Sequence, residues 1–144
     1  MTKSVREVMT PKVQSVTEQQ PLVEAARLMK TQDVGSLPVV ADGRVVGTLT
    51  DRDIVLRAVA EGADLSSVRV GDIASHEPVT VSPDQGLDEA LSLMAKHRVR
   101  RLPVVEGGAL VGMLSQADVA LESSEKETGA LVEAISEATS TDRE

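Results

Sequence analysis

Two stretches of this chain decide the fold: DVGSLPVVADGRVVGTLTDRD at residues 33–53 and RVRRLPVVEGGALVGMLSQAD at residues 98–118. A shift of 65 residues superposes them. The match extends without a gap from 5–53 to 70–118, and 18 of these 49 positions are identical. Self-similarity at a fixed spacing is typical of a repeated structural unit. The chain therefore carries two copies of one unit, and each copy is too small to bury much surface alone.

The two copies predict the same order of elements: strand, helix, strand, strand, helix. An apolar period of 3.6 residues predicts the first helix, and two apolar runs joined by ADGR or EGGA predict a hairpin. The fold class is therefore α/β. The predicted strands are 13–17, 36–40 and 44–50 in the first copy and 78–82, 101–105 and 109–115 in the second; the predicted helices are 21–30 and 51–60, then 86–96 and 116–121.

The first helix of each copy is expected to bury one apolar face. Pro38 and Pro103 lack a backbone N–H, so each is expected near a strand start or on a sheet edge. The residues predicted to form the buried helical faces are Leu22, Ala25, Ala26 and Met29, and Leu87, Ala90, Leu91 and Met94.

Repeat 1 is expected to span 5–63 and repeat 2 to span 70–124. Packing of the two repeats sheet to sheet, with pseudo-two-fold symmetry, is the expected route to a single core. The acidic tail at 125–144 has two interpretations. It contains an apolar pattern at 131–135 that suits a short amphipathic helix, or it is a frayed end.

Composition excludes several classes of function. The chain has no Cys, which removes disulfides, thiolate metal sites and Cys nucleophiles, and suits a reducing compartment. It has no Phe, Tyr or Trp to stack on bases and a net charge of −8, so nucleic acid is not an expected partner. Neither a signal peptide nor an apolar run of membrane-span length is recognisable, so a cytoplasmic protein is expected.

The second strand of each copy ends in a shared motif, GTLTDRD at 47–53 and GMLSQAD at 112–118. A Ser or Thr followed three residues later by Asp is a capping-box signal, which alone can explain Thr50 and Ser115. The motif also suits a ligand. A carboxylate offers two acceptor oxygens to a cis-diol, a helix start favours a phosphate, and the glycine leaves room for close backbone approach.

The strand-helix-strand-strand-helix unit, the LPVV strand and the Gly-x-x-Thr/Ser-x-x-Asp ending resemble the cystathionine-β-synthase (CBS) domain. Such domains occur as tandem pairs called Bateman modules, and this chain is similar to the stand-alone bacterial pairs of the hypoxic-response type. The resemblance covers about 5–121. It implies a non-catalytic, regulatory protein that binds AMP, ADP, ATP or S-adenosylmethionine in clefts between the two repeats, requires no cofactor and forms a homodimer.

The resemblance also implies which residues line the two clefts. In the family, the motif Asp holds the ribose hydroxyls, the Ser or Thr bonds ribose or phosphate, and a segment of the other repeat completes the cleft. The run KHRVRR at 96–101 has no basic counterpart in the first copy, so the two clefts are expected to differ in charge. The predicted clefts are Thr50 and Asp53 with Val99, Arg100, Arg101, Pro78 and Val79, and Ser115 and Asp118 with Val34, Gly35, Val13 and Gln14.

Other interpretations remain open at this point. The basic run at 96–101 has two interpretations: it is exposed to solvent at a helix end, or it binds phosphate. The module is a ligand-free interaction or stress-response scaffold, or an S-adenosylmethionine binder, instead of an AMP, ADP or ATP sensor. His76 and His97 lie 21 residues apart without a Cys partner, so no metal site is expected. No arrangement of catalytic residues is recognisable.

Overall fold

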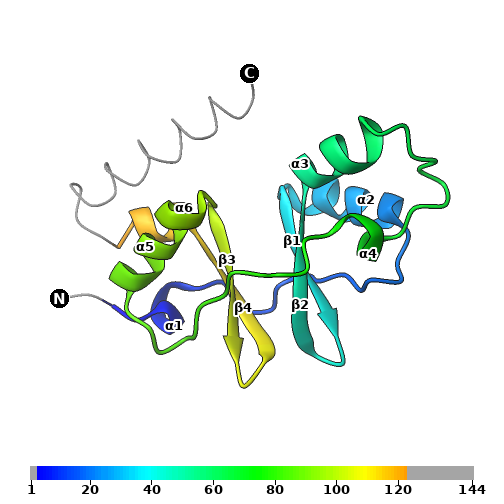
Figure 1. Ribbon diagram of the computed structural model, residues 1–144. Helices are drawn as coiled ribbons and strands as arrows, with labels where there is room; N and C mark the ends of the chain where they lie inside the picture. Colours follow the sequence, from blue (N-terminus) through cyan, green and yellow to red (C-terminus); the bar gives the residue numbers. More distant parts are fainter. Residues whose placement is uncertain (1–2, 123–144) are drawn as a thin grey trace. The chain divides into compact units, whose positions relative to one another are not determined.

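The computed structural model describes residues 3–122, which form two compact units. Unit 1 contains 3–13, 79–107 and 111–122, and unit 2 contains Gln14–Pro78 and Gly108–Leu110. The predicted α/β class is confirmed in both units, since each contains a two-stranded antiparallel hairpin with helices (Figure 1). The arrangement of the two repeats sheet to sheet stays a prediction, and the predicted tail helix lies outside the described residues.

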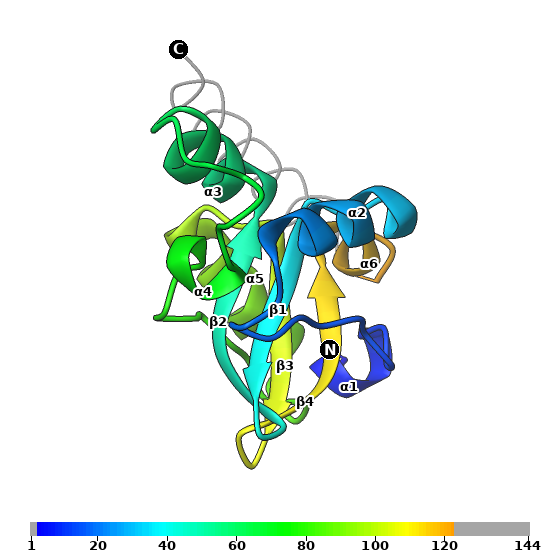
Figure 2. The same cartoon turned by 90° about the vertical axis from the view of Figure 1, so that its right-hand side faces the viewer.

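Unit 2 follows the predicted order of elements closely. A helix leads into a hairpin, the hairpin leads directly into a second helical segment, and a short helix follows (Figures 1 and 2). The elements of unit 2 are α2 (Leu22–Gln32), β1 (Ser36–Ala41), β2 (Arg44–Thr50), α3 (Asp51–Ile54), the π-helical turn η1 (Val55–Val59) and α4 (Val70–Ile73).

Unit 1 repeats this arrangement with a short helix contributed by the start of the chain. Strands β3 and β4 are hydrogen-bonded neighbours, as β1 and β2 are. The elements of unit 1 are α1 (Val5–Val8), α5 (Leu87–His97), β3 (Arg101–Glu106), β4 (Ala109–Ser115, whose first two residues belong to unit 2) and α6 (Gln116–Ala120).

Both predicted hairpin turns are confirmed. Asp42 and Gly43 have φ of 53° and 79°, and Gly107 and Gly108 have φ of 61° and 87°. Two successive positive φ values match the twist of the flanking strands, and Asp-Gly and Gly-Gly supply them at low cost. The first hairpin pairs residues from Ser36 with Thr50 to Ala41 with Arg44, with one shift after Val39.

The short helices α1 and α4 were not predicted. Helix α1 begins the first sequence repeat but packs with the elements of the second, and α4 begins the second repeat but packs with those of the first. Helix α1 lies in unit 1, where the Val5 N–H donates to the Gln85 carbonyl at 2.9 Å. Helix α4 lies in unit 2, where the Val70 N–H donates to the Gln20 carbonyl at 2.9 Å. The compact units and the sequence repeats are therefore different divisions of the chain.

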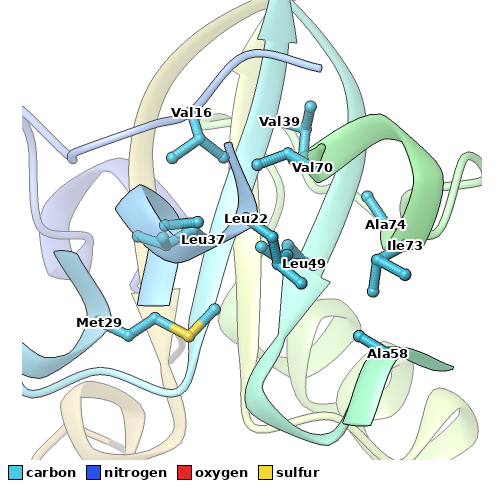
Figure 3. Close-up of a cluster of buried hydrophobic side chains, with 11 residues drawn as sticks. Val16, Leu22, Met29, Leu37, Val39, Leu49, Ala58, Val70, Ile73 and Ala74 are labelled. Atoms are coloured by element: carbon cyan, nitrogen blue, oxygen red, sulfur yellow. The ribbon is translucent and has the colours of Figure 1, made fainter. Parts of the chain in front are cut away.

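Each unit has its own aliphatic core. In unit 2, side chains from α2, the hairpin, η1 and α4 converge around Leu49, which is fully buried (Figure 3). The predicted face of α5 is confirmed at all four positions, and that of α2 at three. Ala26 is the exception, because the buried stripe Leu22, Ala25 and Met29 is narrow and leaves Ala26 exposed. The core of unit 1 contains Val5, Val81, Leu87, Ala90, Leu91, Met94, Leu102, Val104, Leu114 and Val119.

Three predicted elements, two strands and one helix, differ in length or pitch from the prediction. The strands expected at 13–17 and 78–82 are reduced to single parallel bridges, Val16 with Val39 and Val81 with Val104. The chain turns away at once, since the Gln20 N–H donates to the Thr17 carbonyl at 3.3 Å. The helix expected at 51–60 is helical throughout 51–59, but its second half is the π-turn η1.

The isolated bridges explain the prolines. Val16 donates its N–H to the Pro38 carbonyl at 3.0 Å, and Val81 donates to the Pro103 carbonyl at 3.1 Å. Both prolines accept hydrogen bonds and need donate none, so their missing N–H costs nothing at these strand positions. Among the helices of residues 3–122, none is long and apolar enough to cross a bilayer.

Candidate functional site

The GTLTDRD motif forms a complete capping box at the start of α3. Thr50 is the N-cap, and its hydroxyl accepts a hydrogen bond from the Asp53 N–H at 3.0 Å. The Asp53 carboxylate accepts in return from the Thr50 N–H, also at 3.0 Å. Both bonds are partly buried. The capping interpretation of Thr50 is therefore confirmed, and one carboxylate oxygen of Asp53 is hydrogen-bonded to a backbone N–H.

The GMLSQAD motif is bonded differently. The Ser115 hydroxyl accepts from the Asp118 N–H at 3.1 Å, so Ser115 is also an N-cap. Within the described chain, however, the Asp118 carboxylate makes no return bond to the Ser115 N–H. Its Oδ2 instead lies 3.5 Å from the hydroxyl of Thr10, which comes from the segment after α1. Two motifs that look equivalent in sequence thus hold their carboxylates in different ways.

The glycines of both motifs leave room for another segment to approach closely, and that segment belongs to this chain. A Cβ on Gly47 would lie 2.3 Å from the Ser75 carbonyl oxygen. A Cβ on Gly112 would lie 2.7 Å from the Met9 sulfur and 2.9 Å from the Thr10 carbonyl oxygen. The predicted close backbone approach exists, but it is made by the segments after α4 and α1.

Those segments are held by short antiparallel bridges. Thr48 exchanges two backbone hydrogen bonds with Ser75, at 3.0 and 2.9 Å, and Met113 exchanges two with Thr10, at 2.8 and 2.9 Å. The residues that touch the motifs, Thr10 and Ser75, are 65 positions apart and so occupy equivalent places in the repeat. The equivalence of Thr10 and Ser75 was visible in the sequence, but the contact of these residues with the motif strands was not.

Each motif has a second neighbour from the turn before the hairpin of its own unit. In unit 2, the Gly35 carbonyl accepts from the Asp51 N–H at 2.9 Å, and a Cβ on Gly35 would lie 2.9 Å from an Asp51 carboxylate oxygen. In unit 1, the Arg100 carbonyl accepts from the Gln116 N–H at 2.8 Å. Arg100 therefore lies beside the Ser115 motif.

The two motif ends differ strongly in charge. Residues 31–36 and 50–53 carry three carboxylates and one base, whereas 96–101 and 115–118 carry four bases and one carboxylate. In the described part of the chain, no ion pair or side-chain hydrogen bond is formed by Lys96, Arg98, Arg100 or Arg101. Residues 3–122 of this acidic protein thus concentrate positive charge, without a partner among them, at the Ser115 end of unit 1.

The remaining predicted site residues lie as follows. Val99 and Val79 pack against the core of unit 1. Val34 packs against the core of unit 2, its N–H donating to the Met29 carbonyl at 3.0 Å, and Gln14 is exposed. Each predicted cleft combines residues of both units, so the two combinations stay predictions.

Both histidines have structural explanations. His76 Nε2 lies 3.0 Å from the Gly71 carbonyl oxygen, and His76 Nδ1 lies 3.7 Å from the Glu18 carboxylate. His97 is exposed in the last turn of α5. Over residues 3–122, no group of three or more His, Asp or Glu side chains is placed to hold a metal ion.

Comparison with known proteins places the chain in a family. The model of the CBS domain matches residues 5–59 and 70–125. CBS domain-containing protein YhcV of Bacillus subtilis is 42% identical over 125 residues, which cover 87% of this chain and 89% of that protein. Hypoxic response protein 1 of Mycobacterium tuberculosis is 36% identical over 133 residues, which cover 92% of this chain and 93% of that protein.

A solved structure extends the similarity to the fold. The crystal structure of CBSX2 in complex with AMP matches 82% of this chain and 93% of the CBSX2 chain, with a TM-score of 0.72 and 28% identity. The repeated unit, its Gly-x-x-Thr/Ser-x-x-Asp ending and these similarities lead to one conclusion. The chain is a tandem pair that belongs to the CBS domain family.

Proposed function

We propose that this protein is a non-catalytic regulatory module that binds an adenine nucleotide through its Thr/Ser-x-x-Asp motifs. The observation that carries the proposal is the chemistry of the Ser115 end of unit 1, where a carboxylate and a hydroxyl follow the second hairpin and four bases, unpaired within residues 3–122, precede it or begin it. The related protein CBSX2, crystallised in complex with AMP, supports the choice of ligand class.

The residue types suit the parts of a nucleotide. Asp53 and Asp118 offer acceptor oxygens to the two ribose hydroxyls. Thr50 and Ser115 offer hydroxyls to ribose or phosphate, and Arg100 and Arg101 offer donors to phosphate. The remaining members of the proposed site are Val34, Gly35, Gln14, Val79 and Val99, which come from the turns before the hairpins and from the segments that precede the first helices.

A calorimetric ligand panel tests the proposal. A ligand at 100 times its Kd stabilises the folded state by about 2.7 kcal/mol, which raises the unfolding temperature of a chain this size by roughly 8 °C. We expect such a shift with AMP, ADP or ATP in differential scanning calorimetry, and a much smaller shift in the Asp53→Ala/Asp118→Ala double variant. Calorimetry is the suitable method because the chain has no aromatic residue for intrinsic fluorescence.

The panel also separates the alternatives. A larger shift with S-adenosylmethionine than with any nucleotide would favour the S-adenosylmethionine binder. No shift with any of these ligands at millimolar concentration would exclude the nucleotide sensor and favour a ligand-free interaction scaffold. Equal shifts in the wild type and the double variant would place the ligand elsewhere on the protein.

We also propose that the protein is a homodimer. The π-turn η1 leaves Val55 and Val59 each 54% exposed and Leu56 45% exposed, which is unusual for three neighbouring aliphatic residues of a monomer. Light scattering of the wild type is expected to give twice the mass of 15.2 kDa. A monomer at every concentration up to the millimolar range would contradict the homodimer.

A further inference from the structure

Four bases where α5 ends and β3 begins lack a partner among residues 3–122. The side chains of Lys96, Arg98 and Arg100 are exposed, and that of Arg101 is partly buried. None of them forms an ion pair with a described residue. These four residues are named the basic end of unit 1. Because like charges so close in the chain repel one another, the basic end favours an anionic partner.

The backbone of the helix end does not require this positive charge. Arg98 ends α5 in the left-handed conformation with φ of 56°, and its equivalent Asp33 ends α2 with φ of 54°. In both helices the residue after the cap donates its N–H, at 3.0 Å, to the carbonyl of a methionine five residues earlier. The helix dipole favours a base in the last turn, but Arg100 and Arg101 lie beyond the helix. Folding alone therefore does not explain the basic end.

The last described residue lies near the basic end along the chain of unit 1. The Gln116 N–H donates to the Arg100 carbonyl at 2.8 Å, so α6 begins beside Arg100. The six residues from there to Glu122 span about 9 Å, at about 1.5 Å per helical residue. The Glu122 N–H donates to the Val119 carbonyl at 3.0 Å, and the Glu122 carboxylate lies 2.8 Å from the Lys3 ammonium. The chain beyond Glu122 therefore starts from a point held on unit 1.

The acidic tail at 125–144 supplies the opposite charge. It contains six carboxylate side chains and two bases, whereas 96–101 and 115–118 contain four bases and one carboxylate. Glu125 follows Glu122 by three residues and can lie up to about 10 Å from it, at about 3.4 Å per residue. The first carboxylates of the tail can therefore reach the basic end, and the covalent link gives them an effective concentration of about millimolar.

We propose that the acidic tail binds the basic end of the same unit through ion pairs and competes there with anionic ligands. The contact itself needs no nucleotide. The competition rests on the proposed function, because Arg100 and Arg101 are the residues assigned there to phosphate. An anionic ligand must displace the tail, which raises the ligand concentration needed to fill half of the sites.

Paramagnetic relaxation in NMR tests the contact in the full-length protein. The chain has no cysteine, so Ser136→Cys can carry a single nitroxide label within the tail. The amide signals of 96–101 are expected to broaden much more than those of the equivalent residues 31–36. The excess broadening should disappear at about 1 M sodium chloride, where the Debye length falls to about 3 Å.

A tail of equal length with fewer charges separates attraction from tethering. This neutral-tail variant replaces the four glutamates of 125–137 and keeps the label, and its broadening of 96–101 is expected to be several-fold smaller. The substitutions are Glu125→Gln, Glu127→Gln, Glu133→Gln and Glu137→Gln. Equal broadening by the wild-type and neutral tails would overturn the contact. Broadening concentrated at 55–59 would also overturn it, because the apolar pattern of the tail would then select the contact instead of its charge.

Isothermal titration calorimetry with AMP tests the competition. The neutral-tail variant, without the label, is expected to bind AMP several-fold more tightly than wild type. Glu24→Gln/Glu61→Gln, which removes two exposed acids of unit 2, is expected to keep the wild-type affinity. Equal affinities of wild type and the neutral-tail variant would overturn the competition, and so would an equal gain in the unit 2 control. If none of these proteins binds AMP, the proposed function fails, while the broadening still decides the tail contact.

Discussion

Replacing Gly47 with alanine lowers the free energy of unfolding by about 3 kcal/mol, the upper part of the range for overpacking a buried site. The added Cβ would lie 2.3 Å from the Ser75 carbonyl oxygen, a backbone atom that no side-chain rotation can move. Relief requires the Ser75 segment to withdraw, which breaks its two backbone hydrogen bonds with Thr48. Far-UV circular dichroism is expected to show an unfolding temperature roughly 10 °C below wild type.

Two other glycines supply graded comparisons for Gly47→Ala. Gly112→Ala is expected to cost about 1–2 kcal/mol, because one of the two atoms in its way is the flexible Met9 sulfur. Gly86→Ala meets nothing within 4 Å and is expected to cost less than about 1 kcal/mol, the effect of a poorer N-cap on α5. Equal losses in Gly47→Ala and Gly86→Ala would mean that the Ser75 segment does not press against β2.

The hairpins were predictable because their signals are local. Asp42 and Gly43 tolerate positive φ, and an apolar run of strand length flanks them on each side. The faces of α2 and α5 were predictable for the same reason, since a period of 3.6 residues needs no knowledge of distant contacts. The error at Ala26 reflects the width of the buried stripe, which depends on what α2 packs against.

The exchange of α1 and α4 between copies was not predictable from local pattern. Each helix has only four residues, too few to show a hydrophobic period, and its buried anchors are Val5 in α1 and Val70 and Ile73 in α4. The repeat register did contain a signal, because the ungapped match begins at Val5 and Val70. Which copy each helix joins is a matter of tertiary packing that the register does not specify.

The different contacts of the two motifs also depend on tertiary packing. The sequence shows that Thr50 and Ser115 are equivalent and that bases precede only the second hairpin. It does not show that the Arg100 carbonyl bonds the Gln116 N–H, or that Thr10 faces Asp118. Both contacts join segments far apart in the chain or on opposite sides of a hairpin, so local pattern does not specify them.

Replacing Leu114 with alanine lowers the free energy of unfolding by about 3 kcal/mol, within the range of about 2–5 for deleting a buried leucine side chain. Leu114 is 0% exposed in the core of unit 1 and directly precedes Ser115. Its side chain therefore anchors the end of β4 that carries the motif. The cavity left behind should also loosen the placement of Ser115 and Asp118, so we expect weaker nucleotide binding together with an unfolding temperature roughly 10 °C lower.

Leu121→Ala is the matched control for Leu114→Ala. It deletes the same atoms from the same unit, but Leu121 is 84% exposed, so the loss is expected to stay below about 0.5 kcal/mol. Restoring volume with Leu114→Met should recover most of the stability, because methionine fills nearly the same space. If Leu114→Ala were as stable as Leu121→Ala, the end of β4 would not be anchored in the core, and the geometry assigned to Asp118 would lose its support.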